Sequence, residues 1–480
     1  MPASQLRRTK IIATLGPATD DPKIFQQMIA AGVDVVRLNF SHGPAEQHKK
    51  RAQLVRDCAA TVGKEIGIMA DLQGPKIRIS RFKEKKVELK EGATFILDAD
   101  LDKEAGDEHR IGIDYKALVK DVHVGDNLLL DDGRLVFTVE KLEGNQIICR
   151  VIVGGELSNN KGINRQGGGL SAKALTDKDK EDMKTVAEIG ADYVAISFPR
   201  SADDMYEARE LLNQLKCNAG LIAKIERTEA ITVLDEIIIA SDAVMVARGD
   251  LGVEIGDAEL PAVQKHIIQR CRALDKAVIT ATQMMESMIH NAIPTRAEVF
   301  DVANAVLDGT DAVMLSAETA TGDHPALVIE SMARICLGAE SQAIARVSKH
   351  RVECQFQRPD ELIAMSAMYA ANHFDISAII ALTESGSTPL WMSRIRSGIP
   401  IYALTRNVAT QRRVTLYRGV YPVYFNMDTD DQHGLNHLAI KRCVQHGIIK
   451  KGDWILLTFG DQVGHHGGTN TLKVMQVDQI

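Results

Sequence analysis

The sequence predicts an α/β protein made of a (β/α)8 barrel (TIM barrel), a small all-β lid domain inserted into the barrel, and a C-terminal doubly wound α/β domain. Short apolar segments rich in valine and isoleucine alternate with longer amphipathic stretches in two separate parts of the chain. Between Asp71 and about Ser171, short segments of alternating polarity replace this pattern. The first pattern is typical of parallel sheets with helices between their strands, and the second of an all-β domain.

Eight apolar segments supply the expected barrel strands. Their apolar residues run without interruption, which indicates a sheet buried on both faces and therefore a parallel one. Thr176 and Ser201 are residues that can begin two of the intervening helices. Eight strand-then-helix units suggest a closed barrel formed by residues 1–70 and 172–345. The expected strands are 10–15, 33–38, 66–70, 193–196, 221–225, 243–247, 277–281 and 312–315.

The interruption, residues 71–171, is expected to form the lid. Turn signals such as Asp132-Gly133 and Gly144-Asn145 separate its short segments. An insertion after the third barrel strand would hang over the C-terminal ends of the strands, where a lid is useful. The expected strands are 87–89, 94–97, 127–130, 135–139 and 146–153.

Strand and helix patterns resume after about Arg346 and predict an open doubly wound sheet over residues 346–480. A polar stretch at 348–360 is the expected linker, and helices are expected around 361–374 and 389–396. The expected strands are 376–382, 399–404, 420–425, 454–457 and 472–477.

Composition excludes several classes of protein. The 480 residues carry 57 basic and 64 acidic side chains, a net charge of −7, and only 4% are aromatic. Such a chain has no general attraction to nucleic acid or to anionic lipid, so we expect neither as a partner. Seven widely spaced cysteines without a CxxC pair favour reduced thiols in the cytoplasm. Neither a signal peptide nor an apolar stretch long enough to span a membrane is found.

Polar residues end nearly every expected barrel strand, and the C-terminal strand ends form the active face of such barrels. Any one of them is readily explained as a turn or cap residue. A succession that contains a lysine, an arginine and three carboxylates is harder to explain in that way. These residues are Asn39, Asp71, Ser197, Lys224, Glu226, Arg248, Asp250, Thr282, Gln283 and Ser316.

Lys224 and Glu226 lie two residues apart on a strand, so their side chains leave the same face. An ordinary surface ion pair is the alternative. Glu226 and Asp250 follow adjacent strands, and two hard oxygen ligands completed by water and substrate are typical of Mg²⁺. Gly249 would let a substrate approach the backbone.

Several cations are expected at the same face. Arg37, Asn39 and Ser41 alternate along one segment and can point into the barrel mouth, while Lys76, Arg78 and Lys161 lie near the ends of the insertion. Cations beside paired carboxylates suit a phosphorylated acid held with Mg²⁺.

A second anion-binding candidate follows a strand of the C-terminal domain and opens a helix. It comprises Thr383, Glu384, Ser385, Gly386, Ser387 and Thr388. The alternative is a helix start with more capping residues than it needs. The Gly167-x-Gly169 segment is interpreted as a loop, and Met284, Met285 and Met288 as core residues.

Several motifs together resemble the pyruvate kinase family: R-L-N-F-S-H-G, M-A-D-L-x-G-P-x-I-R, N-N-K-G-I-N, I-S-F-P-R, A-K-I-E, M-V-A-R-G-D-L-G, T-A-T-Q-M-M-E-S-M and M-L-S-A-E-T-A-x-G. The likeness runs from about Arg8 to the C-terminal T-N-T-L-K-V. It implies transfer of a phosphoryl group from phosphoenolpyruvate to ADP, giving pyruvate and ATP in the last step of glycolysis. Because the family is usually tetrameric, we expect a homotetramer. Independently of the resemblance, we expect a cytoplasmic protein and activation by a phosphorylated metabolite such as a sugar phosphate or AMP.

The resemblance implies roles for single residues. Glu226 and Asp250 would hold Mg²⁺ (or Mn²⁺). Lys224 and Arg37 would face the phosphoryl group, and Gly249, Asp250 and Thr282 would hold the carboxylate end of the substrate. The nucleotide would face Asn39, Phe40, Ser41, His42, Arg78 and Lys161. Apart from the resemblance, we expect the segment 383–388 to bind the effector, because it lies in a separate domain on loop residues that could hold a phosphate.

In the family, K⁺ is bound by groups that match Asn39, Ser41, Asp71 and the carbonyl of Leu72. Members with lysine at the position of Lys76, often with leucine at that of Leu72, are associated with K⁺ independence. A lysine ammonium near that site could replace the ion. We therefore expect no strict requirement for K⁺, while a merely solvated lysine is the alternative.

Two functions of other classes stay open on the residues alone. One is an aldolase or lyase acting on a keto acid, either Mg²⁺-dependent or with Lys224 as a Schiff-base lysine. The other is a binding protein that senses a phosphorylated metabolite through the C-terminal domain.

Overall fold

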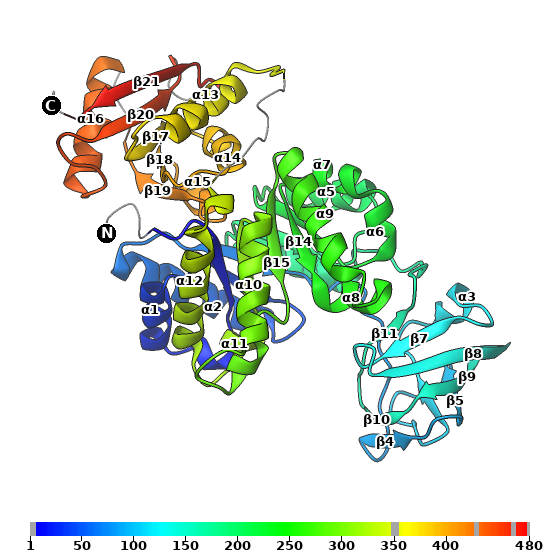
Figure 1. Ribbon diagram of the computed structural model, residues 1–480. Helices are drawn as coiled ribbons and strands as arrows, with labels where there is room; N and C mark the ends of the chain where they lie inside the picture. Colours follow the sequence, from blue (N-terminus) through cyan, green and yellow to red (C-terminus); the bar gives the residue numbers. More distant parts are fainter. Residues whose placement is uncertain (1–5, 347–354, 427–431, 462–466, 478–480) are drawn as a thin grey trace.

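The computed structural model describes residues 6–346, 355–426, 432–461 and 467–477 (Figure 1). It confirms the expected fold class, with a closed eight-stranded barrel, a mixed β region inserted into it, and a C-terminal α/β domain. The lid and the C-terminal domain extend from the barrel in different directions (Figure 1).

The barrel closes in the strand order β1-β16-β15-β14-β13-β12-β3-β2, with all pairs parallel. Seven of its strands are buried along their whole length or at all but one residue, as the uninterrupted apolar segments predict. The strands are β1 (Lys10–Thr14), β2 (Val35–Asn39), β3 (Gly67–Asp71), β12 (Tyr193–Ile196), β13 (Gly220–Ile225), β14 (Ala243–Ala247), β15 (Ala277–Ala281) and β16 (Ala312–Leu315).

Helices surround the barrel and cover the outward side chains of the strands. Ile225, for example, joins the core between strands and helices, whereas Ile222 lies in the core inside the barrel. Thr176 begins its helix with a capping box shared with Asp179, as expected. The helices are α1 (Pro22–Ala31), α2 (Ala45–Val62), α4 (Asp177–Glu188), α5 (Ala202–Gln214), α6 (Thr228–Thr232), α7 (Leu234–Ala240), α8 (Arg248–Ile255), α9 (Leu260–Ala273), α10 (Arg296–Asp308), α11 (Ala317–Ala320) and α12 (Pro325–Glu340).

The lid has its own apolar core, in which Phe95 and Phe137 pack with ring centroids 5.6 Å apart. Six strands form one sheet in the order β11-β7-β8-β9-β5-β6, and β10 pairs with β4. The sequence did not predict β6, β10 and β11. The elements are β4 (Lys86–Leu89), β5 (Thr94–Asp98), β6 (Arg110–Gly112), α3 (Leu118–Asp121), β7 (Asn127–Leu130), β8 (Leu135–Glu143), β9 (Gln146–Val153), β10 (Gly155–Ser158) and β11 (Ile163–Arg165).

The C-terminal sheet has the order β19-β18-β17-β20-β21, and β21 runs antiparallel to β20. Part of the expected linker, residues 347–354, lies outside the described residues. The last two residues of the expected linker, Pro359 and Asp360, instead begin helix α13. The elements are α13 (Pro359–His373), β17 (Ala378–Leu382), α14 (Ser387–Ser393), β18 (Ile401–Thr405), α15 (Val408–Val414), β19 (Val420–Tyr424), α16 (Gln432–Gln445), β20 (Trp454–Phe459) and β21 (Thr471–Gln476).

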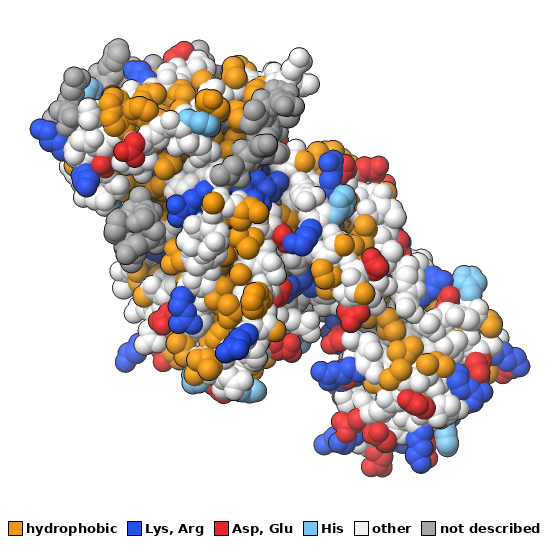
Figure 2. All heavy atoms as spheres, in the orientation of Figure 1, with side chains coloured by type: hydrophobic (Ala, Val, Ile, Leu, Met, Phe, Trp, Pro, Cys, Tyr) orange, Lys and Arg blue, Asp and Glu red, His pale blue; other side chains and the backbone are white. Residues whose placement is uncertain are grey.

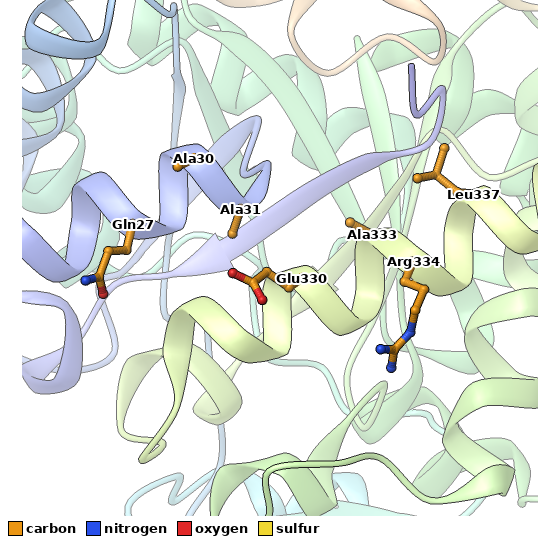
Figure 3. Close-up of a pocket in the computed structure, with 7 residues that line it drawn as sticks. All are labelled: Gln27, Ala30, Ala31, Glu330, Ala333, Arg334 and Leu337. Carbon is orange, nitrogen blue, oxygen red and sulfur yellow. The ribbon is translucent and has the colours of Figure 1, made fainter. Parts of the chain in front are cut away.

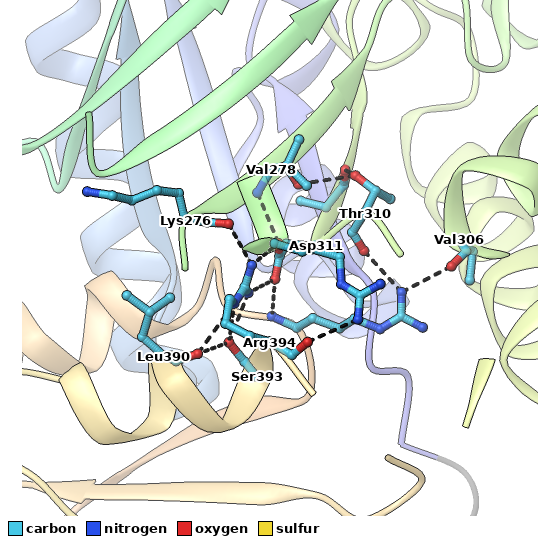
Figure 4. A network of polar contacts seen from close by, with 11 residues as sticks. Lys276, Val278, Val306, Thr310, Asp311, Leu390, Ser393 and Arg394 are labelled. Atoms are coloured by element: carbon cyan, nitrogen blue, oxygen red, sulfur yellow. Dashed lines mark hydrogen bonds and ion pairs between the residues drawn. The ribbon is translucent and has the colours of Figure 1, made fainter. Parts of the chain in front are cut away.

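A buried ion pair joins the C-terminal domain to the N-terminal end of the barrel (Figure 4). Arg394, directly after α14, pairs with Asp311, directly before β16, and each side chain is 1% exposed. Asp311 also accepts hydrogen bonds from the backbone N–H groups of Val278 and Arg418, at 2.9 and 3.1 Å. One carboxylate thus organises two barrel strands and the docked domain.

On the face drawn in Figure 2, basic and acidic side chains are interspersed over the barrel and the lid. None of the helices in the described part of the chain is both long and apolar enough to cross a membrane.

Candidate active site

Charged side chains from neighbouring strands meet at the C-terminal end of the barrel. Arg37 of β2 donates to Asp71 of β3 at 2.6 Å. The Lys224 ammonium lies 3.2 Å from the Asp71 carboxylate and 3.0 Å from that of Glu226. It also donates to the hydroxyl of Ser197 at 2.7 Å. The structure therefore brings Arg37 and four of the predicted strand-end residues into one cluster.

The cluster shifts the acidity of its members. Although burial opposes the effect, Lys224 and Arg37 lower the pKa of Asp71 below its usual range. Burial also opposes the charged form of Lys224, but Asp71 and Glu226 outweigh it and raise the pKa of the ammonium. Lys224 is therefore a protonated, nearly buried cation, so it lacks the free amine that a Schiff-base mechanism needs.

Glu226 and Asp250 fit a divalent metal ion. Burial, with the nearby negative charges of Asp250 and Asp71, raises the pKa of Glu226 to about 7 despite Lys224. A divalent cation between Glu226 and Asp250 would relieve that repulsion. Among the described residues, no three His, Cys, Asp or Glu side chains form a complete metal site. Substrate and water oxygens would therefore complete the coordination, as is usual for Mg²⁺.

Thr282 lies beside the start of α8. Its hydroxyl accepts a hydrogen bond from the Gly249 N–H at 2.8 Å. A Cβ added at Gly249 would make only ordinary contacts, 3.8 Å or more from Thr282. The protein itself therefore does not require glycine here, and the space in front of this backbone is open to a ligand.

The segment after β2 forms a tight turn. Asn39 accepts a hydrogen bond from the Ser41 N–H at 3.1 Å, and the Phe40 N–H donates to the Asp71 carbonyl at 2.9 Å. The ring of Phe40 stacks on that of His48. His42 follows in the same turn, its N–H donating to the Asn39 carbonyl.

Of the three predicted lid cations, Lys76 reaches the barrel. Its ammonium lies 3.1 Å from Asp250. Lys161 pairs with Asp131 at 2.6 Å, and Arg78 donates to the Asn160 carbonyl at 2.9 Å. These contacts of Arg78 and Lys161 lie within the lid, so the structure does not bring the two side chains against the barrel cluster.

The candidate effector segment 383–388 connects β17 to α14. Gly386 has a φ of +84°, a conformation that favours glycine, and its N–H donates to Thr383. The hydroxyls of Ser385 and Ser387 lie 2.7 Å apart. Both residues line a cavity of about 310 Å³ between this domain and the barrel, together with Lys276, Arg358 and Arg413.

A larger groove of about 510 Å³ lies on the outer surface, between α1 and α12 (Figure 3). Its lining is Gln27, Ala30, Ala31, Glu330, Ala333, Arg334 and Leu337. None of the strand-end residues contributes to it, so the polar cluster and not this groove is the candidate active site.

Comparisons with known proteins agree over nearly the whole chain. The family models "Pyruvate kinase, barrel domain" and "Pyruvate kinase, alpha/beta domain" match residues 6–329 and 361–475. The chain is 55% identical to Pyruvate kinase II of Salmonella typhimurium, with 99% of each chain covered. This chain belongs to the pyruvate kinase family. It is also 54% identical to the Haemophilus influenzae pyruvate kinase (97% of this chain, 98% of the relative) and 40% identical to that of Geobacillus stearothermophilus (99% and 81%).

The family assignment decides against the aldolase and the metabolite-sensing protein that the residues alone left open. Pyruvate kinases generally use a divalent metal ion, which agrees with the fit of Glu226 and Asp250. Two contacts at the candidate site were not predicted: Thr14 accepts a hydrogen bond from Arg37 at 3.2 Å, and Lys76 pairs with Asp250. Thr14 ends β1, so the strand-end rule could have found it.

Proposed function

We propose that the cluster around Lys224 is the site at which this enzyme transfers a phosphoryl group. The protein is a pyruvate kinase, a phosphotransferase that converts phosphoenolpyruvate and ADP to pyruvate and ATP. The observation that carries the site assignment is the nearly buried Lys224 ammonium, held between Asp71 and Glu226 at the C-terminal end of the barrel. Phosphoryl transfer depends mainly on positioning and charge neutralisation, which such a cluster can supply.

In this proposal Lys224 and Arg37 face the transferring phosphoryl group, and Lys224 stabilises the negative charge that develops on the enolate oxygen. Asp71 orients both cations, because its two oxygens contact one each. Gly249, Asp250 and Thr282 bind the carboxylate end of phosphoenolpyruvate. Glu226 and Asp250 hold Mg²⁺ or Mn²⁺, which when bound neutralises phosphate charge.

The nucleotide site is proposed at Asn39, Phe40, Ser41, His42, Arg78 and Lys161. Because Arg78 and Lys161 belong to the lid, closure of the lid would carry both toward the barrel mouth. The K⁺ site implied by the family would comprise Asn39, Ser41, Asp71 and the Leu72 carbonyl. Lys76 is proposed to make that ion dispensable.

A coupled turnover assay tests the activity. We expect pyruvate and ATP to form from phosphoenolpyruvate and ADP with Mg²⁺ or Mn²⁺ and without added K⁺. Glu226→Gln and Asp250→Asn should each raise the Mg²⁺ concentration needed for half-maximal rate. If neither variant changes the Mg²⁺ concentration for half-maximal rate, the proposed metal site is wrong. The assignment of the enzyme's overall reaction would not be affected.

The segment 383–388 is proposed to bind the phosphate of an activating sugar phosphate or AMP. Lys276, Arg358 and Arg413 line the adjoining cavity and outnumber its two carboxylates, Asp242 and Asp275, so they can supply positive charge that the segment lacks. Ser385→Glu would place a carboxylate where the phosphate should lie, so we expect a normal maximal rate and lost activation; Ser385→Ala is the matched control. A lower maximal rate with intact activation would contradict a regulatory role.

The expected homotetramer and cytoplasmic location stay predictions.

A further inference from the structure

Thr282 and Gln283 form a turn that their residue types disfavour. Their φ angles are +69° and +55°, in the left-handed region where side chains other than glycine are uncommon. A β-branched threonine is a particularly unfavourable occupant. Two consecutive residues keep such a conformation only where surrounding groups hold them in it, and such positions gather at functional sites.

Arg248, the first residue of α8, bonds to two carbonyls of this turn, and the Thr282 hydroxyl adds a bond of its own to the Ala281 carbonyl at 2.6 Å. Its guanidinium donates from Nε to the Ala281 carbonyl at 3.0 Å and from one terminal nitrogen to the Thr282 carbonyl at 2.5 Å. The other terminal nitrogen pairs with Asp301 of α10 at 2.7 Å. Only 9% of Arg248 is exposed. The rigid planar fork of an arginine suits two neighbouring carbonyls, whereas a lysine presents a single point charge.

The same backbone continues into the substrate-facing groups. Gly249 and Asp250 follow Arg248 directly, and the Gly249 N–H donates to the Thr282 hydroxyl at 2.8 Å. The start of α8 and the turn are therefore joined from both sides, by the Arg248 side chain and by the Gly249 backbone.

We propose that Arg248, anchored by Asp301, is a positioning residue that holds the Thr282 hydroxyl in place for the carboxylate end of phosphoenolpyruvate. Arg248 itself does not touch the substrate. The inference rests on the proposed role of Thr282. Displacement of a positioned group by about 1 Å can lower a rate by roughly 10²-fold, so a loosened turn should be costly.

A double-mutant cycle between Arg248→Lys and Thr282→Ala tests this. In the wild-type background we expect Arg248→Lys to lower kcat/KM for phosphoenolpyruvate by about 10²-fold, with the KM for ADP changed by less than about twofold. In the Thr282→Ala background, Arg248→Lys should lower kcat/KM by less than about threefold, because the hydroxyl that Arg248 positions is gone. Arg270→Lys is the matched control, since Arg270 forms an arginine–carboxylate pair with Asp235 on the outer surface.

The possible outcomes distinguish the role of Thr282 from that of Arg248. If Thr282→Ala alone is as active as wild type, both the role of Thr282 and the positioning by Arg248 are wrong. If Thr282→Ala is impaired but Arg248→Lys costs the same factor in both backgrounds, Thr282 keeps its role and the positioning is overturned. If Arg248→Lys does not fold, Asp301→Asn tests the same proposal, because Asp301 is one-third exposed and its replacement should be tolerated. We expect Asp301→Asn to lower kcat/KM for phosphoenolpyruvate several-fold, and again only when Thr282 is present.

Discussion

At the scale of single residues, spacing on a strand correctly predicted that Lys224 and Glu226 lie together. Lys224 lies in β13 and Glu226 follows its last residue; because side chains alternate along a strand, the two leave the same face, and they form an ion pair at 3.0 Å. The contact between Lys76 and Asp250 could not be predicted in this way, since 174 positions of sequence separate the two residues. Nor does residue type predict the left-handed turn at Thr282, because threonine disfavours that conformation.

Replacement of Lys224 by methionine should abolish phosphoryl transfer. The cation contributes most where charge develops in the transition state, so we expect kcat to fall by roughly 10³-fold or more with only a modest change in the KM for phosphoenolpyruvate. Steady-state kinetics measure this, with Lys180→Met, a surface lysine of α4, as the matched control. A kcat within tenfold of wild type would show that Lys224 has another role.

Lys76 should remove the need for K⁺. We predict substantial activity in a buffer whose only monovalent cation is a bulky organic one. Lys76→Glu should then create or sharply increase a dependence on K⁺, because a carboxylate cannot supply the positive charge that offsets phosphate repulsion. Lys83→Glu, on the exposed surface of the lid, is the control. A wild-type enzyme that is inert without K⁺ and recovers many-fold with it would contradict this and restore Asn39, Ser41 and Asp71 as an occupied site.

At the scale of secondary-structure elements, strands that are buried and apolar were predicted well, whereas three-residue strands and elements without a local pattern were not. The lid strand β11 (Ile163–Arg165) is only three residues long, and its pairing with β7 depends on distant sequence. Helix α8 starts at Arg248 directly after β14, and Ala247 in the cap position provides no side-chain hydrogen bond. The sequence therefore contains neither a capping residue nor a loop from which the start of this helix could be predicted.

Glu254, near the end of α8, should make stability depend on pH. Burial raises its pKa to about 7, although a hydrogen bond from the Thr228 N–H opposes the shift. Between the ordinary carboxyl pKa and about 7, the folded protein binds more protons than the unfolded chain, so the free energy of unfolding decreases as pH rises. Glu254→Gln, which cannot ionise, should therefore unfold a few degrees higher than wild type at pH 8 and at nearly the same temperature at pH 5.

Thermal unfolding at the two pH values measures this effect. Glu207→Gln on α5, where the carboxylate is 46% exposed, should leave the pH dependence unchanged. A Glu254→Gln protein that loses as much stability as wild type between pH 5 and pH 8 would show that Glu254 is not the responsible group.

At the scale of the whole molecule, the sequence predicted three domains but not how they dock. The Tyr193 hydroxyl at the base of the barrel donates to the Arg413 carbonyl of the C-terminal domain at 2.7 Å, and one apolar core runs through both. Arg394 and Asp311 belong to no recognisable motif, because a buried pair between domains has no local pattern. Their role becomes visible only when both strand ends and α14 are placed in space.

Removal of the Arg394 guanidinium should weaken this junction. Arg394→Met leaves Asp311 buried without its main counter-charge, and breaking a buried pair in this way typically costs about 3–5 kcal/mol. We expect a lower unfolding temperature and faster cleavage between the domains in limited proteolysis. Arg334→Met, on the exposed face of α12, is the control. Unchanged unfolding and proteolysis would mean that apolar packing alone holds the domains together.

The neck of the lid has a consequence for chain entropy. Barrel strands β3 and β12 lie side by side, with Met69 opposite Tyr193, yet the whole lid separates them in sequence. At the neck the two connecting segments pair: the Ile79 N–H donates to the Lys161 carbonyl, and the Ile163 N–H to that of Ile77, each at 2.9 Å. Because loop-closure entropy depends on the length of free chain, a folded lid leaves the barrel with little more than an ordinary strand–helix–strand connection through α4 (Asp177–Glu188). An insertion of about a hundred residues therefore adds little to the entropic cost of closing the barrel.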